Sequence, residues 1–146
     1  MWKIDLFGLL FGLNDKFSGS KINIGYEKGG QHSAFSIATN LIYFNQYRQE
    51  LILQIAPRYY YNLKKRIQKG KTANNLSADY FSLRNQWDLI GRDSFIENKY
   101  DFSLLWGTQR RVFKNMFINY ELGYDFQSGN QWSGEIISEL KIGLAF

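Results

Sequence analysis

Charged side chains recur at alternate positions through the later part of the sequence, and they are the residues best suited to chemistry. Glu121, Asp125 and Glu139 carry carboxylates that can approach one another if their segments are neighbours. Such carboxylates can transfer protons or bind a cation. Arginine and lysine share the same pattern, so ion pairing is the favoured interpretation. We predict an internal charge network of Arg58, Arg84, Asp88, Asp101, Glu121, Asp125, Glu139 and Lys141.

His32 is the only histidine, so a histidine-dependent hydrolase would have to use it. Ser33 follows it directly, but successive residues of a strand point to opposite faces and do not readily form a nucleophile–base pair. His32 also falls in a predicted short turn, and an ordinary turn residue is the favoured interpretation. The sequence has no phosphate loop, metal-ligand cluster or nucleophile elbow, and no cysteine. We therefore expect no catalytic residue, metal site or cofactor.

A compact basic segment accounts for the net positive charge of the chain, +5. It contains Lys64, Lys65, Arg66, Lys69 and Lys71 and no acidic residue. Subtracting these five from eighteen basic residues leaves thirteen, which balances the thirteen acidic residues. Nucleic-acid binders usually spread basic residues over a face and interleave aromatic ones, so this compact cluster argues against that class.

The basic segment is predicted to form a short helix from Leu63 to Lys69, with Asn62 as its N-terminal cap and Gly70 as its end. Leu63 and Ile67 then share one side of the helix and the basic residues the other. One interpretation is a solvated loop. The other is a docking element for an acidic partner or for anionic lipid headgroups.

Eight segments with alternating polarity must position these side chains. They cover residues 2–12, 21–28, 34–45, 48–61, 79–90, 98–110, 113–126 and 135–146. Antiparallel strands joined in sequence leave two unpaired edges unless the sheet closes. We therefore predict a single domain, residues 1–146, that is all-β and folds as a closed antiparallel up-and-down eight-stranded transmembrane β-barrel. About ten tilted residues span roughly 25 Å, the height of the apolar membrane band.

The small residues on the polar face indicate that this face is the interior. Gly25, Gly107, Gly123 and Gly143 all lie on it, as does Glu27, and small residues suit a crowded lumen. Aromatic residues of the apolar face gather near the strand ends, as expected for two membrane interfaces. One predicted belt contains Trp2, Tyr26, Phe35, Tyr59, Tyr61, Phe81, Trp106 and Phe146, and the other contains Tyr43, Trp87, Tyr100, Tyr124 and Phe126.

The longest apolar stretch, Leu6 to Leu13, has eight residues, which excludes a helical membrane protein. The same residues do not resemble a signal peptide, because Asp5 interrupts them and no small-residue cleavage site follows. Removing them would also leave seven strands, an odd number that is disfavoured for bacterial barrels. We infer that the numbering begins on a mature or recombinant chain.

The last segment alternates in polarity and stops on an aromatic residue. With Gly143 and Phe146 it resembles the C-terminal insertion signal of bacterial outer-membrane β-barrels. Residues 57–66 and 70–75 (PRYYYNLKKR and GKTANN) also resemble Bacteroidota barrel sequences. The resemblance implies a bacterial outer-membrane location, contact with outer-membrane lipids, periplasmic termini and insertion by the barrel-assembly machinery. It implies no shared catalytic activity.

These features predict a non-enzymatic outer-membrane barrel that acts as a structural or accessory subunit of a larger envelope complex. Short exterior connections such as Gln46-Tyr47 argue against an adhesin. Because lipid-modifying enzymes exist on small outer-membrane barrels, an enzyme using His32 is one alternative. A soluble lipocalin-like carrier with its apolar face inside is another. A pore is disfavoured, because side chains fill an eight-stranded barrel.

Overall fold

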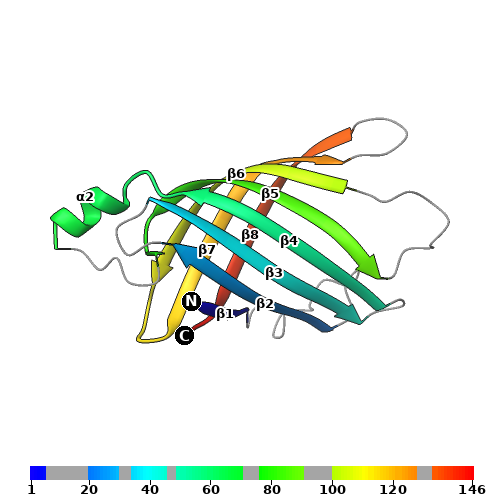
Figure 1. The fold of residues 1–146 in the computed structure, drawn as a ribbon, viewed down its shortest axis with the longest axis horizontal. Helices are drawn as coiled ribbons and strands as arrows, with labels where there is room; N and C mark the ends of the chain where they lie inside the picture. Colours follow the sequence, from blue (N-terminus) through cyan, green and yellow to red (C-terminus); the bar gives the residue numbers. More distant parts are fainter. Residues whose placement is uncertain (6–19, 30–33, 46–48, 71–75, 91–99, 128–132) are drawn as a thin grey trace.

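The computed structural model describes residues 1–5, 20–29, 34–45, 49–70, 76–90, 100–127 and 133–146. Within them the chain forms a closed antiparallel barrel in which each strand pairs with its neighbours in sequence, as Figure 1 shows. The predicted all-β, up-and-down, eight-stranded architecture is therefore confirmed. A short helix, α2, lies at one end of the barrel (Figure 1).

The strands have bounds close to those that alternation predicts. They are β1 (Trp2–Asp5), β2 (Ser20–Gly29), β3 (Phe35–Asn45), β4 (Gln49–Tyr59), β5 (Asp79–Ile90), β6 (Tyr100–Arg111), β7 (Met116–Gln127) and β8 (Ser133–Ala145), with α2 (Leu63–Gln68) between β4 and β5. The continuation of the first predicted strand beyond Asp5 lies outside the described residues. The prediction that the seventh strand begins at Phe113 is wrong. A turn lies there instead, and the Val112 N–H donates to the Met116 carbonyl at 3.0 Å.

The barrel closes where the two termini meet. Lys3 of β1 pairs with Ala145 of β8. Beyond that pair, the Trp2 N–H donates to the Phe146 carbonyl and the Phe146 N–H donates to the Trp2 carbonyl, each at 2.9 Å. Hydrogen bonding between the first and last strands closes the sheet into a barrel.

The two faces of the wall have opposite chemistry, and the polar face is inside. Outward side chains are apolar and exposed; those of at least 40% exposure on the strands include Trp2, Ile24, Phe35, Ile37, Leu41, Tyr59, Phe81, Leu83, Leu89, Leu104, Leu122, Tyr124, Ile136 and Leu140. Inward side chains include buried charged and amide groups: Lys3, Asn23, Glu27, Gln54, Arg58, Arg84, Gln109, Asn119, Glu121 and Lys141. This is the reverse of a barrel that buries an apolar core, and it agrees with the predicted orientation of the faces.

Helix α2 is held against the barrel end by a small apolar cluster. Leu63 is buried with Tyr60, Ala78 and Tyr80, and Ile67 packs against them. The exposed side of the helix carries Lys64 and Lys65, so its sidedness agrees with the prediction. No helix in the described ranges has the length and hydropathy needed to cross a membrane.

The predicted capping role of Asn62 is wrong. Its side chain makes no capping hydrogen bond to α2. Instead the Asn62 amide donates to the Asp79 carboxylate, and the Asp79 N–H donates to Asn62 Oδ1 at 3.0 Å. Asn62 therefore ties the start of α2 to the first residue of β5. Beyond the helix, Gly70 has a φ of +66°, a left-handed conformation in which glycine carries no Cβ penalty.

Candidate functional site

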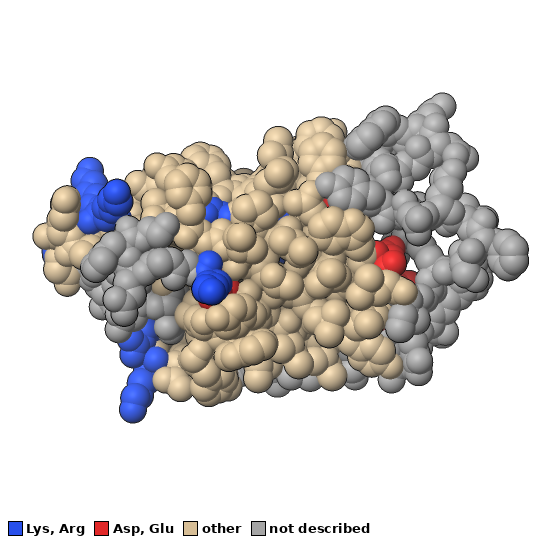
Figure 2. All heavy atoms as spheres, in the orientation of Figure 1, with Lys and Arg blue, Asp and Glu red and all other residues tan. Residues whose placement is uncertain are grey.

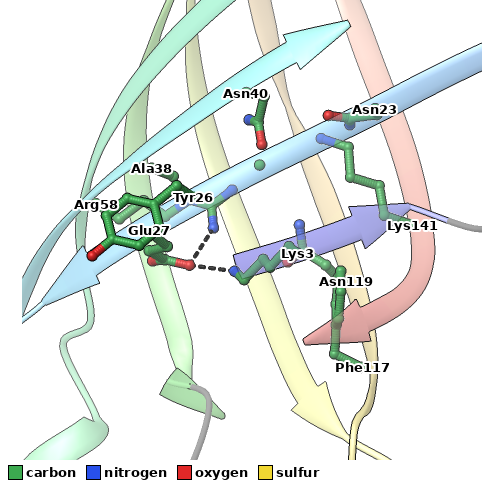
Figure 3. A pocket seen from close by; sticks show the side chains of 11 residues that line it. Lys3, Asn23, Tyr26, Glu27, Ala38, Asn40, Arg58, Phe117, Asn119 and Lys141 are labelled. Atoms are coloured by element: carbon green, nitrogen blue, oxygen red, sulfur yellow. Dashed lines mark hydrogen bonds and ion pairs between the residues drawn. The ribbon is translucent and has the colours of Figure 1, made fainter. Parts of the chain in front are cut away.

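Two buried glutamates organise the interior of the barrel, and Glu27 is the first. Its carboxylate pairs with Lys3 and accepts hydrogen bonds from Ser36 Oγ at 2.5 Å, Tyr60 Oη at 2.7 Å and Arg58 Nη1 at 3.2 Å. Figure 3 shows Lys3 and Arg58 converging on it. Because Glu27 is only 2% exposed, this satisfied set of donors is what makes its burial tolerable.

Glu121 is the second organising carboxylate, and it is also 2% exposed. It accepts hydrogen bonds from Arg58 Nη2 at 2.9 Å and Tyr80 Oη at 2.5 Å, and it pairs with Arg84. Lys141 Nζ lies 3.3 Å from its second oxygen. Arg58 thus bridges the two glutamates, and its guanidinium lies 4.6 Å from the centre of the Tyr80 ring.

Glu139 extends the network toward solvent. Its carboxylate lies 2.9 Å from Arg84 Nη2 and 3.0 Å from Lys141 Nζ, with the side chain 26% exposed. Four cations (Lys3, Arg58, Arg84 and Lys141) therefore face three carboxylates. Residues that hydrogen-bond or pair within the network come from every strand: Lys3, Glu27, Ser36, Arg58, Arg84, Gln109, Glu121 and Lys141.

The network fills the lumen at this level and leaves little free space beside it. The cavity in Figure 3 has a volume of about 20 Å³, roughly the space of one water molecule. Lys3, Asn23, Glu27, Arg58, Asn119 and Lys141 are among its lining residues. Asn23 Oδ1 is buried without a hydrogen-bond partner, so a water in this cavity can satisfy it.

Tyr80 fits over a glycine on the neighbouring strand. Tyr80 and Gly107 are directly opposite in the β5–β6 register, and Tyr80 is fully buried. A Cβ on Gly107 would lie 2.6 Å from the Tyr80 hydroxyl and 2.7 Å from Cε2. The missing side chain of Gly107 therefore makes room for the ring that donates to Glu121.

Replacing Gly107 by alanine is therefore expected to destabilise the barrel by about 1–3 kcal/mol, because a packed ring must move. The fraction folded in a urea titration measures the loss. Gly25→Ala is the matched control. Its Cβ would meet chiefly the end of the flexible Asn40 side chain, so a smaller loss is expected. Equal losses for both variants would contradict the role given to Tyr80.

Among the eight predicted network residues, ion pairs join Arg58, Arg84, Glu121, Glu139 and Lys141. The other three lie on the inward face but further toward the opposite end. Asp125 accepts a hydrogen bond from Ser103. Asp88 pairs in register with Ile52 and Asp101 with Gln86. The favoured interpretation of the carboxylates, ion pairing with arginine and lysine, is confirmed for Glu121 and Glu139.

Sequence reasoning missed several members of the network. Lys3 was not singled out, because its partners Glu27 and Gln109 lie on other strands. Tyr60 and Tyr80 were missed because aromatic residues were expected on the outside. Their signal was present, since each lies one residue away from an outward aromatic residue, Tyr59 or Phe81. Gln109 is uncharged and was therefore not part of the predicted charge network. Its Oε1 nevertheless accepts a hydrogen bond from Lys3 Nζ at 2.7 Å.

Comparison with protein-family models, with curated proteins and with solved structures finds no match for this chain. The site must therefore be interpreted from its own geometry. Among the residues that the structure describes, no group of three or more His, Asp or Glu side chains is arranged to hold a metal ion. His32, Ser33, Gln46, Tyr47 and Lys71 lie outside the described residues.

The end of the barrel that carries both termini and α2 is basic. Its exposed or half-exposed cations are Lys28, Lys64, Lys65, Arg66, Lys69, Arg110, Arg111 and Lys114. Asp79 also lies at this end, and its carboxylate is 2.5 Å from Arg110 Nη2. Figure 2 shows lysine and arginine gathered toward the α2 end, beside a long surface with few charges. We call this region the basic end.

Aromatic side chains form the predicted belt just inside the basic end. Trp2 packs against Tyr26 and Phe35 against Tyr59, each with ring centroids 4.8 Å apart. Phe146, the last residue of the suggested insertion signal, is exposed beside Trp2, whereas Gly143 faces inward. Of the second predicted belt, Tyr124 and Phe126 are in contact at 4.8 Å.

Proposed function

We propose that this chain is an integral protein of a bacterial outer membrane and acts there as a non-enzymatic structural or accessory subunit of an envelope complex. One observation carries the proposal: the strands expose apolar side chains outward while ion-paired groups fill the interior. A wall with this polarity is suited to lipid outside and would expose a large apolar surface in water. The strand lengths and the aromatic belt at the basic end support the same assignment.

The side chains inside the barrel favour a structural role over a pore or a ligand carrier. A lipocalin-like carrier requires an apolar internal cavity, whereas this lumen is crossed by arginine, lysine and glutamate. These side chains also obstruct an open pore at the level of Arg58. The carboxylates that sequence patterning offered for acid–base chemistry are engaged in ion pairs, which favours a scaffold over an enzyme.

Gel mobility with and without boiling in SDS tests the membrane assignment. We expect the protein in the membrane fraction, released only by detergent, with a faster or slower band before boiling than after it. A closed barrel resists SDS until heated because its strand hydrogen bonds have no open edge. Release from washed membranes without detergent, together with no shift on heating, would contradict the proposal. A subunit role further predicts that chemical crosslinking in membranes captures a second envelope protein.

A further inference from the structure

An apolar groove lies on the outer wall next to the basic end. It has a volume of about 840 Å³. Most of its lining is outward apolar residues, among them Tyr59, Phe81, Leu83, Leu104, Trp106 and Ile136, and the inward residues Arg58 and Ser82 also reach it. Pro57 also lines it, at a point where the β4–β5 ladder is interrupted between Ile55 and Arg58. Proline has no N–H to donate, which accounts for that interruption.

Four cations of the basic end lie on α2 or directly after it. Lys64, Lys65 and Lys69 are exposed on and just after α2, and Arg66 is half-exposed. No ion pair or hydrogen bond joins these four side chains to any residue in the described part of the chain, and the Arg66 Nε is buried without a partner. Their positive charge is therefore available to an external anion.

Tyr61 connects the groove to the helix. Its ring packs against Phe81 with centroids 5.4 Å apart, and its hydroxyl accepts a hydrogen bond from Trp106 Nε1 at 3.1 Å. Phe81 and Trp106 both line the groove. Because α2 begins at Leu63, its basic residues lie directly beyond the aromatic belt. In a membrane barrel, this is the depth of the lipid headgroups.

We propose that the groove and α2 together bind one anionic phospholipid, with its acyl chains along the groove and its phosphate at Lys64, Lys65 and Lys69. The inference rests on the proposed membrane location. Tyr61 links the apolar groove to the basic residues of α2. A lipid with apolar chains and an anionic headgroup needs both surfaces side by side. An acidic protein partner would use the cations but would have no reason to use the groove. Lipid is therefore the occupant that accounts for both features.

The test measures lipid retention by native mass spectrometry. The purified barrel is incubated with equal amounts of phosphatidylglycerol and phosphatidylcholine that carry identical acyl chains. We expect the wild-type barrel to retain phosphatidylglycerol preferentially. The triple variant Lys64→Gln, Lys65→Gln, Lys69→Gln is expected to lower that retention by at least about tenfold, since each basic residue near a headgroup contributes substantially to anionic lipid binding. The triple Lys→Arg variant keeps the charge and is expected to keep the preference.

A second pair of variants tests the groove. Leu104→Trp places bulk in the groove and is expected to reduce retention of both lipids. Leu41→Trp is the matched control, because Leu41 is an exposed outward leucine of β3 that does not line the groove. Equal effects of the two tryptophans would overturn the groove assignment.

Equal retention of both lipids by the wild-type barrel would overturn the headgroup assignment and leave the cations to an acidic protein. Heat-dependent gel mobility of the same samples separates this failure from failure of the membrane proposal. A sample that shifts on heating but shows no lipid preference contradicts only the lipid site. A sample that shows no shift contradicts the proposal on which the site rests.

Discussion

Glu121→Gln is expected to destabilise the barrel by about 3–5 kcal/mol, the usual cost of breaking a buried ion pair by removing one partner. Glutamine keeps the size of the side chain but removes the charge that Arg58, Arg84 and Lys141 share. Those cations would remain in the lumen with less compensation. The loss exceeds that of an ordinary hydrogen bond because each of the three is at least nine-tenths buried.

Urea titration of the barrel in lipid vesicles, followed by gel mobility of unboiled samples, measures the change. Glu135→Gln is the matched control because Glu135 is exposed on β8, where a charge contributes less than about 1 kcal/mol. Similar midpoints for the two variants would show that the lumen network does not hold the barrel together. A much lower urea midpoint for Glu121→Gln than for Glu135→Gln would show that the ion pairs of the lumen stabilise the fold.

The period-two pattern was sufficient to predict the barrel and the sides of its wall. Alternation assigns every residue of a strand to one face, so a few clear positions such as Leu104 and Trp106 orient all of β6. Closure followed from the number of strands and the cost of open edges. The turn between β6 and β7 is longer than predicted because Phe113, an exposed aromatic residue, continues the apolar pattern, whereas β7 begins only at Met116.

The sequence alone could not predict which side chains pair inside the lumen, because that depends on the register of strands far apart in the chain. Lys3 and Gln109 are 106 residues apart yet hydrogen-bonded, and nothing in their local sequence relates them. Asn62 shows the same limit at the basic end: its local context predicts a helix cap, but Asp79 competes successfully for its side chain. Sequence patterns thus identified inward charges without showing which of them meet.

The substitution Leu41→Arg tests whether lipid or water covers the outer face of the barrel. Leu41 is 43% exposed near the middle of β3, and it faces Ile24 and Leu53 on the neighbouring strands. If lipid covers this wall, an arginine at mid-depth is expected to cost about 2–4 kcal/mol. If water covers it, the same substitution replaces an exposed leucine by a solvated cation and changes the stability by less than about 0.5 kcal/mol.

Val112→Arg supplies the control for the size and charge of the new side chain. Val112 is 46% exposed, but it lies in the turn after β6, outside the strands. Arginine there is expected to be nearly neutral in either solvent, because the turn lies at the basic end beyond the aromatic belt. Both variants are compared by urea titration in the same vesicles. A selective loss for Leu41→Arg assigns the wall to lipid, whereas equal stability of the two variants contradicts a membrane-spanning barrel even if the fold is closed.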